Sequence, residues 1–341
     1  MKAAVLETID APLVISEVEL GPLGNGQVLV KILVSGVCGS QLQEIAGYKG
    51  NAKFVPHLLG HEGCGIVEKV GEGVTTVKKG DKVVMHWRKG EGIESDFPSY
   101  MYKGRKMSSG KVTTLSEYSI VSENRLTVAP KDTPNDFCAL LGCGLSTALA
   151  TIENEANVQR GESVLVVGVG GLGASLTKAA SLAGANPIIA LDIHDKETMA
   201  KSLGATHFFN SAKEDIKEAL GKAGIKDVNV IVETSGSAES IRDTLPLLAG
   251  SGRYILVGQP KPGASVEIMN AVHLFGGEGK MIKATQGGQF APARDIGRYI
   301  QKYAKTLDTS LLITHRTALD KINDAITMMR EGKANRIMVD L

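Results

Sequence analysis

The stretch SVLVVGVGGLGASLTKAASLAGA, residues 163–185, decides the fold of the middle of the chain. It begins as a continuous apolar run, which is typical of a strand buried on both faces. The run enters GVGGLG, where Gly168, Gly170 and Gly173 fit the G-x-G-x-x-G pattern. These glycines permit a tight turn, close approach of the backbone to a pyrophosphate, and close packing of helix on strand. The following residues favour a helix, whose first N–H groups bind phosphate. The pattern predicts a dinucleotide site.

The next apolar run, PIIALDI (187–193), strengthens this prediction because it carries an acid near its end. Asp192 stands 19 residues after Gly173, close to the spacing of the carboxylate that binds a ribose 2′-OH. A carboxylate there repels a 2′-phosphate, so we expect NAD rather than NADP, with His194 softening the preference. The alternative interpretation of Asp192 is a helix N-cap.

Strand and helix patterns divide the 341-residue chain into three segments. Residues 1–145 are rich in short alternating runs, with strands expected at 27–37, 63–71 and 81–87, and favour a small β-barrel. Residues 146–286 alternate apolar strands with helices, which favours a parallel sheet covered on both faces. Residues 287–341 carry two helices and a last strand. We therefore expect an α/β protein whose middle domain is inserted into the first.

Bulk composition excludes several classes of protein. The chain has 38 Lys and Arg against 37 Asp and Glu, so its charge gives no support to nucleic acid binding or membrane attraction. No stretch reaches the roughly 18 apolar residues of a membrane helix. The N-terminal segment is interrupted by Glu7 and Asp10 and does not resemble a signal peptide. These features lead us to expect a cytoplasmic protein.

The stretch GHEGCGIVEKVGEGV, residues 60–74, places an imidazole beside a carboxylate in a predicted strand. His61 can ligate zinc, and Cys38 and Cys143 are its obvious partners because glycines flank both. Cys64 lies an odd number of residues from His61, so a strand points it to the other face. Cys138 and Cys143 are five apart, which puts them on different sides if that segment is helical. The alternative is that the histidine is structural and the cysteines are simply buried.

The order of these motifs resembles that of the zinc-dependent medium-chain alcohol dehydrogenases. GVCGS, GHE, GCGLST, GVGGLG and a strand ending in Asp192 follow one another as in that family, and the likeness extends to GKANRIMVDL at the end. The resemblance implies a GroES-like barrel as the first domain and a Rossmann fold as the middle domain. It implies one catalytic zinc bound by Cys38, His61 and Cys143, with Glu62 behind the metal as an alternate ligand.

The same resemblance assigns further roles in the transfer of hydride from an alcohol to NAD, with zinc as Lewis acid. Ser40 corresponds to the hydroxyl that takes the alcohol proton, and Trp87 to an aromatic of the substrate pocket. The implied cofactor contacts are Thr147, Gly168, Gly170, Gly171, Leu172, Gly173, Asp192, Val257 and Arg336. The alternatives are a turn serine for Ser40, a core residue for Trp87 and an exposed charge for Arg336.

Three departures from the family pattern change these expectations. The segment after Trp87 has no cysteine, so a structural zinc held by four thiolates is excluded and one zinc per subunit is expected. Gln41 stands where relatives have an aspartate that orients the histidine ligand, which affects metal affinity or the pKa of a bound water. Gln43 replaces a relay histidine, so protons leave through the ribose hydroxyls and water, or through His57, which we expect to be a partly exposed histidine.

The sequence leaves the substrate open. Residues 88–111 carry six cations, which either form a solvated loop or border the pocket and attract an anionic sugar acid or phosphorylated polyol. Our main hypothesis is an NAD-dependent zinc alcohol dehydrogenase that acts on a small alcohol or carbonyl compound. The alternatives are a polyol or sugar dehydrogenase of the same family and a non-catalytic NAD-binding redox sensor. By resemblance we expect a homodimer or homotetramer.

Overall fold

The computed structural model describes residues 1–341 apart from the side chain of Asn51. The chain forms two compact units: residues Met1–Ser146 with Ala291–Leu341, and residues Thr147–Phe290. The second unit is therefore continuous in sequence and interrupts the first. The sequence places the inserted domain at residues 146–286, and these limits remain predictions.

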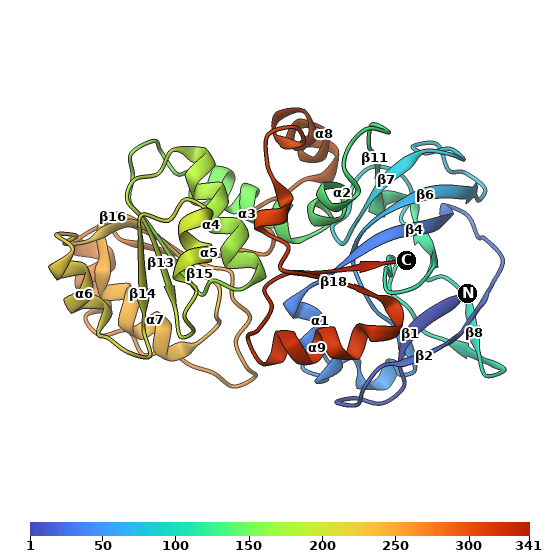
Figure 1. Cartoon of the computed structure of the whole chain (residues 1–341), viewed down its shortest axis with the longest axis horizontal. Coiled ribbons are helices and arrows are strands. Elements are labelled where there is room, and N and C mark those ends of the chain that lie inside the picture. Colours follow the sequence, from blue (N-terminus) through green and yellow to red (C-terminus); the bar gives the residue numbers. More distant parts are fainter. The chain divides into compact units, whose positions relative to one another are not determined.

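A seven-stranded sheet forms the centre of the first unit (Figure 1). Its order is β11-β7-β6-β4-β19-β18, and β10 also pairs with β4. The C-terminal strand β19 runs antiparallel to β4, with Ile337 opposite Val37, so the two ends of the chain share one sheet. The strands are β4 (Gln27–Val37), β6 (Glu62–Val70), β7 (Lys82–His86), β10 (Tyr118–Ser122), β11 (Leu126–Val128), β18 (His315–Ala318) and β19 (Ile337–Asp340).

Two small sheets and several helices complete the first unit. The sheets have the orders β2-β1-β5 and β3-β8-β9. Their strands are β1 (Lys2–Leu6), β2 (Val14–Glu17), β3 (Glu19–Leu20), β5 (His57–Leu58), β8 (Tyr100–Tyr102) and β9 (Arg105–Met107). The α-helices are α1 (Gly39–Ile45), α2 (Asn135–Leu141), α8 (Pro292–Tyr303) and α9 (Ile322–Arg330). Single 3-10 turns are η1 (Asn51–Phe54), η2 (Glu123–Arg125), η6 (Thr309–Leu311) and η7 (Leu319–Lys321).

Close packing of β4 on β6 explains the glycines in this part of the sequence. A Cβ atom at Gly65 in β6 would overlap the side chain of Val30 in β4. Val30 lies in a buried apolar cluster with Val28, Ile32 and Val67, all at most 1% exposed. Because interiors are packed as densely as organic crystals, a side chain at residue 65 would separate the two strands.

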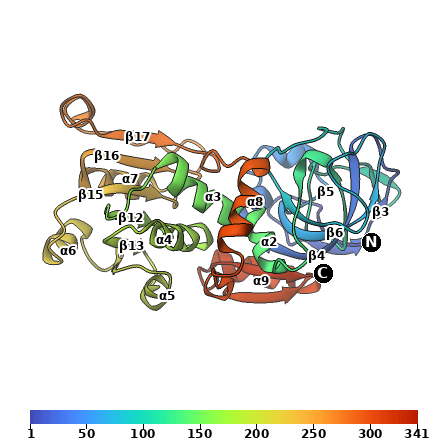
Figure 2. The ribbon, with the colours of Figure 1, turned by 90° about the horizontal axis from the view of Figure 1, so that it is seen from above.

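The second unit is a parallel sheet of six strands in the order β14-β13-β12-β15-β16-β17, with helices packed around it (Figure 2). Numbered along the chain, this is the 3-2-1-4-5-6 order of the Rossmann fold. Its strands are β12 (Val164–Val167), β13 (Ile188–Asp192), β14 (His207–Asn210), β15 (Val228–Glu233), β16 (Leu248–Leu256) and β17 (Met281–Ala284). Its helices are α4 (Gly171–Ala183), α5 (Glu197–Ser202), α6 (Ile216–Lys222) and α7 (Ala238–Thr244), with the turns η3 (Thr151–Glu155), η4 (Leu245–Leu247) and η5 (His273–Gly277). Helix α3 (Gly144–Ala150) runs across the limit between the units.

The turn between β12 and α4 has the backbone that its glycines predicted. Every residue of β12 is buried, as expected for a strand covered on both faces. Gly168 has φ of +85°, which side chains rarely tolerate. A Cβ atom at Gly173 would overlap the carbonyl oxygen of Gly168, so strand and helix pack at this distance only because residue 173 is glycine. Helix α4 ends at Gly184, whose φ of +78° forms a left-handed C-cap.

The structure confirms the long elements expected from the sequence and adds short ones. Strand β4 covers the expected residues 27–37, and the expected C-terminal helices and final strand are α8, α9 and β19. Strands β3, β5, β8 and β9 were not expected, because two or three residues are too few to establish an alternating pattern.

No single helix within the described residues is long and apolar enough to cross a membrane. One bent pair, Asn135–Leu141 with Gly144–Glu155, meets the same criteria of length and composition across a bend of 61°.

We expect Gly173→Ala to destabilise the second unit by about 1–3 kcal/mol, because the added methyl group overlaps the Gly168 carbonyl and forces α4 away from β12. Gly221→Ala is the matched control. Gly221 lies in α6 with no atom within 4 Å of an added Cβ, and alanine is the better helix former, so stability stays the same or rises by up to about 1 kcal/mol. Urea unfolding followed by circular dichroism measures both; equal midpoints for the two variants would contradict this packing.

Candidate functional site

Cys38 lies where strand β4 turns into helix α1. Its backbone is extended, with φ of −101° and ψ of 148°, and it is the N-cap residue of the helix. Gly39 follows, and no atom lies within 4 Å of where its Cβ would be. The thiol is therefore presented at a strand end, next to a residue with no side chain.

His61 directly precedes strand β6, and its position depends on Gly60. Gly60 has φ of +95°, and a Cβ atom there would overlap the side chain of Thr114. The chain thus turns sharply before it enters the strand, and His61 is held at the strand end rather than within the pleat.

Cys143 lies in the short link between α2 and α3, between two glycines that allow close contacts. A Cβ atom at Gly142 would overlap the carbonyl oxygen of Met85 in β7. A Cβ atom at Gly144 would overlap the guanidinium group of Arg336. The link therefore lies directly against the sheet and against the segment that precedes β19.

These three side chains converge although they are far apart in sequence. The ligand atoms of Cys38, His61 and Cys143 all lie within 4.8 Å of one another, and each residue is partly exposed. A tetrahedral zinc ion at about 2.0–2.3 Å from its ligands spaces them roughly 3.5 Å apart. Two thiols and one imidazole form a donor set that suits zinc, and three protein ligands leave one position open. The residues present therefore fit a catalytic zinc ion.

Hydrogen bonding within this cluster separates the acidities of the two thiols. Contact with Cys143, together with His61, holds the pKa of Cys38 well below its ordinary value. The contact with Cys38, together with burial, raises the pKa of Cys143. Burial opposes protonation of His61, but Cys38 raises its pKa overall. The cluster therefore holds one thiolate readily, and a metal ion would displace the remaining thiol proton.

A buried ion pair lies behind the cluster. Glu62 is 0% exposed and Arg336 2% exposed, and Arg336 Nη1 donates to Glu62 Oε1 at 2.5 Å. The other carboxylate oxygen accepts from the Gly144 amide at 3.0 Å. Gly36 in β4 makes room for this carboxylate, because a Cβ atom there would overlap Glu62. Arg336 Nε has no partner among the residues whose side chains are described.

The β12–α4 turn of the second unit forms a cradle for an anion. No atom lies within 4 Å of where a Cβ of Gly170 would be, so the backbone is open to a ligand there. The first N–H groups of α4, from Gly171, Leu172 and Gly173, have no acceptor within the helix. Helix N-termini of this kind bind phosphate groups, so the turn fits the pyrophosphate of a dinucleotide.

Asp192 ends β13 beside this turn. It is 8% exposed and accepts hydrogen bonds from the backbone N–H groups of Val169 and His194, at 2.7 and 2.9 Å. Lys196 Nζ lies 3.6 Å from the carboxylate and also donates to the Val169 carbonyl at 3.3 Å. The carboxylate thus supports the glycine turn itself, and the lysine offsets part of its charge.

Comparison with known proteins assigns both parts of the chain to one family. The model of the alcohol dehydrogenase GroES-like domain matches residues 24–131, and that of the zinc-binding dehydrogenase matches residues 171–305. Alcohol dehydrogenase 6 of Peromyscus maniculatus is 30% identical over 367 residues, which cover 99% of this chain and 97% of that protein. The chain belongs to the zinc-dependent medium-chain dehydrogenase/reductase family.

Solved structures agree with this assignment. An alcohol dehydrogenase zinc-binding domain protein from Burkholderia ambifaria superposes with a TM-score of 0.92, and benzyl alcohol dehydrogenase from Acinetobacter calcoaceticus with 0.88. Each is 26% identical, and the match covers 100% of this chain and 98% and 99% of theirs. As a member of this family the protein is an oxidoreductase with a GroES-like domain and a Rossmann domain.

Gln41 and Gln43, which depart from the family pattern, lie on α1 with Ser40. Ser40 Oγ is 3.4 Å from His61 Nε2, and Gln41 Nε2 is 2.5 Å from His61 Nδ1. Gln43 is partly buried on the same helix. His57, expected to be partly exposed, is instead 6% exposed in β5, and burial lowers its pKa. The expectation failed because β5 was too short to recognise from sequence.

Trp87 follows strand β7 and lies next to the Cys143 link. Its backbone N–H donates to the carbonyl of Gly142 at 3.4 Å. Its indole Nε1 is buried without a hydrogen-bond partner among the described side chains. Arg88 lies over the ring at 5.7 Å, and Arg125 donates to the Trp87 carbonyl. A buried N–H donor aimed at no protein acceptor is compatible with the substrate role expected for Trp87.

Several cations of the segment 88–111 are already paired with carboxylates. Lys111 lies 2.9 Å from Glu94 and Lys89 lies 3.7 Å from it, while Lys103 lies 2.6 Å from Glu7. Such partners reduce the charge available to an anionic substrate. The geometry therefore favours the solvated loop over an anion-attracting border.

The other expected cofactor residues lie in the second unit. Thr147 is 6% exposed on α3, Leu172 is partly exposed in the first turn of α4, and Val257 donates its backbone N–H to Glu233 at 2.9 Å. Arg336 differs from expectation in its surroundings, since it is buried against Glu62 in the first unit. Its role as a pyrophosphate contact remains a prediction.

The sequence interpretation missed two residues. Lys196 lies four residues after Asp192 and pairs with it, a spacing that could have revealed it. Glu44 lies four residues after Ser40 on α1, and burial raises its pKa despite attraction from Lys49. Nothing in the sequence distinguishes Glu44 from an ordinary surface glutamate.

We expect Arg336→Met to cost about 3–5 kcal/mol of stability, because it leaves Glu62 charged and unpaired in the interior. The control is Arg316→Met, since Arg316 is 45% exposed where it pairs with Asp136 and Asp340, and its loss costs about 1 kcal/mol or less. Denaturant unfolding of the first unit measures the difference. Similar losses of unfolding free energy in both variants would show that the buried ion pair contributes no more to stability than the exposed one.

Proposed function

We propose that this protein is a zinc-dependent, NAD-linked dehydrogenase that interconverts an alcohol with its aldehyde or ketone. The convergence of Cys38, His61 and Cys143 is the observation that carries the proposal. Three ligands of this kind with an open fourth position suit catalysis rather than structural support. When bound, zinc supplies a Lewis acid for the substrate oxygen, and NAD supplies the hydride acceptor.

The cysteine count supports one zinc ion per chain. The chain has four cysteines, and the two outside the ligand cluster, Cys64 and Cys138, are both 0% exposed. Residues 88–111 contain none, so a lobe with four thiolate ligands is absent from the sequence. Cys143 as third ligand favours the alcohol type of substrate over the polyol or sugar type, in which relatives often have glutamate at this position.

The second unit supports NAD as the cofactor. Gly168, Gly170 and Gly173 form the open turn at the start of α4, and Asp192 lies beside it with a carboxylate that disfavours a 2′-phosphate. Lys196, 3.6 Å from that carboxylate, moderates the preference. We therefore propose NAD with measurable but weaker use of NADP.

The groups around His61 would handle the substrate proton. Ser40 Oγ lies beside the ring, where it can accept a hydrogen bond from an alcohol and pass the proton on. Gln43 cannot titrate, and burial keeps His57 neutral, so the onward route runs through ribose hydroxyls and water. A sensor without catalysis has no use for an open metal position beside a hydroxyl, which weighs against that alternative.

The test combines metal analysis with absorbance of NADH. We expect the purified protein to bind one zinc per chain and to reduce NAD with at least one of a panel of primary, secondary and benzylic alcohols and polyols. The value of kcat/KM should be higher with NAD than with NADP by about tenfold or more. A zinc-loaded protein that oxidises no member of the panel and reduces no matching carbonyl would favour the sensor.

Cys143→Ala and Cys138→Ala make a matched pair for this assay. Loss of the ligand at residue 143 should remove the zinc and lower kcat/KM by more than about a hundredfold, since even partners of ligands are worth 10- to 100-fold. Cys138 contacts Cys64 away from the cluster, so its replacement should leave metal content and activity unchanged. Equal losses of zinc and of kcat/KM in the two variants would contradict the assignment of Cys143 as a ligand.

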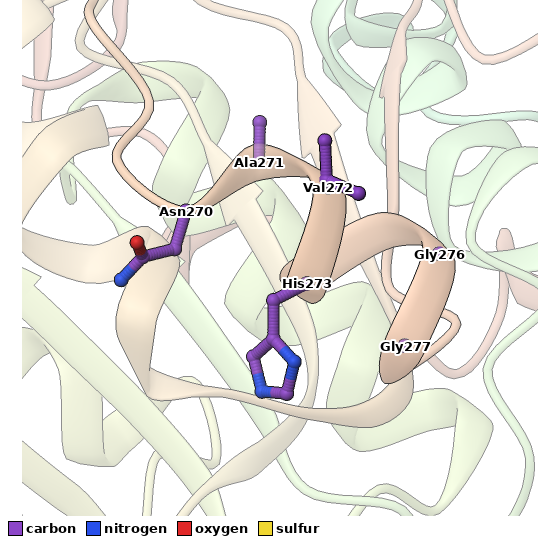
Figure 3. A pocket seen from close by; sticks show the side chains of 6 residues that line it. All are labelled: Asn270, Ala271, Val272, His273, Gly276 and Gly277. Atoms are coloured by element: carbon purple, nitrogen blue, oxygen red, sulfur yellow. The ribbon is translucent and has the colours of Figure 1, made fainter.

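We also propose that the protein self-associates through strand β17 and the segment that precedes it. Met269, Val272 and Met281 are 70%, 88% and 53% exposed, an unusual set of apolar side chains on one short segment. Val272 also lines a shallow depression of about 620 Å³, together with Asn270, Ala271, His273, Gly276 and Gly277. Ala271 and Val272 project to one side of the coil and His273 to the other (Figure 3).

A second copy of the chain fits this segment because β17 is the last strand of its sheet. Its outer edge pairs with no other strand of the described residues, so the edge can accept a strand from a partner. Pairing of strand edges with burial of the neighbouring apolar side chains would give a symmetric dimer.

Val272→Glu should convert the dimer to a monomer, because a carboxylate would be buried at the contact. Val128→Glu is the control, a valine 44% exposed on β11 in the first unit. Light scattering coupled to gel filtration gives the mass of each. A wild-type monomer, or dissociation by both variants, would disprove this surface as the interface.

A further inference from the structure

The side chain of Gln41 links two of the three members of the ligand cluster. It is 1% exposed. Its Oε1 accepts a hydrogen bond from the backbone N–H of Cys38 at 2.9 Å, and its Nε2 lies 2.5 Å from Nδ1 of His61. Gln41 therefore contacts both the strand end that carries one ligand and the ring of another.

The direction of these hydrogen bonds fixes the tautomer of His61. A backbone N–H can only donate, so the amide oxygen of Gln41 must face Cys38 and the amide NH₂ must face the imidazole. An NH₂ group also only donates, so Nδ1 must accept. The proton of the neutral ring then resides on Nε2, which faces Ser40 Oγ at 3.4 Å.

This tautomer is the wrong one for metal binding. Nδ1 is occupied by Gln41, so Nε2 is the nitrogen available to an ion. A neutral histidine that ligates through Nε2 carries its proton on Nδ1 and donates it to an acceptor. With the Gln41 amide in its present orientation, the Nδ1–H group would face the NH₂ of Gln41. Both groups are donors, so no hydrogen bond could form between them.

We propose that Gln41 is a positioning residue whose amide reverses when the Cys38–His61–Cys143 site takes up zinc. The ring proton moves from Nε2 to Nδ1, and the amide oxygen turns to accept it. The backbone N–H of Cys38 then loses the acceptor it has now. The inference rests on the proposed metal site. It adds that Gln41 lowers the zinc affinity of that site and must reorient when zinc binds.

A carboxylate at residue 41 would avoid this conflict. Its two oxygens can accept from the Cys38 N–H and from His61 Nδ1–H at once, and glutamate has the length of glutamine. A carboxylate also favours the tautomer with the proton on Nδ1. The natural glutamine therefore yields a site from which zinc exchanges more readily than it would with an acid at this place.

The experiment measures zinc affinity in zinc-loaded wild type, Gln41→Glu and Gln43→Glu by competition with a chelator. We expect Gln41→Glu to bind zinc about 10- to 100-fold more tightly than wild type. Gln43→Glu adds the same charge two residues along α1, a spacing that does not place two side chains on the same face of a helix, and should change the affinity less than about threefold. Equal affinities for wild type and Gln41→Glu, or equal gains in both variants, would overturn the inference.

A second measurement reads the tautomer directly. Nitrogen-15 spectra of labelled histidine, with His61 assigned by its loss in His61→Ala, should place the proton on Nε2 after chelation of wild type and on Nδ1 after zinc addition. In Gln41→Glu the ring proton should lie on Nδ1 both after chelation and after zinc addition. A proton on Nδ1 in chelated wild type would contradict the inference. Failure of all chains to bind zinc would overturn the proposed metal site and the inference together.

Discussion

The buried ion pair between Glu62 and Arg336 is the interaction on which the ligand cluster depends. The glutamate follows His61, its carboxylate accepts from the amide of Gly144 beside Cys143, and Arg336 also donates to the Val37 carbonyl beside Cys38 at 3.4 Å. This ion pair therefore includes or contacts a residue next to each of the three ligands in sequence: Glu62, Gly144 and Val37. Because charges away from water are tolerated only when paired with good geometry, these segments cannot shift independently.

The charges around the cluster are balanced without Gln41. Two thiolates would neutralise a divalent ion, and Arg336 compensates Glu62. A neutral amide at residue 41 keeps that balance, whereas a carboxylate would add a negative charge. The glutamine amide has only one acceptor oxygen. It therefore cannot accept hydrogen bonds from the Cys38 backbone N–H and from a protonated His61 Nδ1 at the same time. The chain thus combines a rigid charged support on one side of the histidine with an adaptable neutral partner on the other.

Local patterns in the sequence were sufficient for the elements that hold the cofactor turn. Gly168 is required by its positive φ and Gly173 by its contact with the Gly168 carbonyl, and β12 and α4 follow as expected. Strand β4 was equally clear because eleven residues establish their own periodicity. Cys64 contacts Cys138 rather than the ligand cluster, although the parity argument against it does not apply, because His61 precedes strand β6.

Contacts between distant residues were decided by the tertiary structure alone. Glu62 and Arg336 are 274 residues apart, and no local pattern reports that the arginine is buried against the glutamate. The hydrogen bonds of Gln41 depend on how α1 meets the end of β6, and the exposure of Val272 depends on which surfaces the sheet leaves uncovered. Periodicity and glycine placement act within a few turns or strands, so the sequence by itself determined elements and candidate ligands. Pairing across the sheet and burial of charge involve the whole unit, so only the folded chain determined which candidates meet and what supports them.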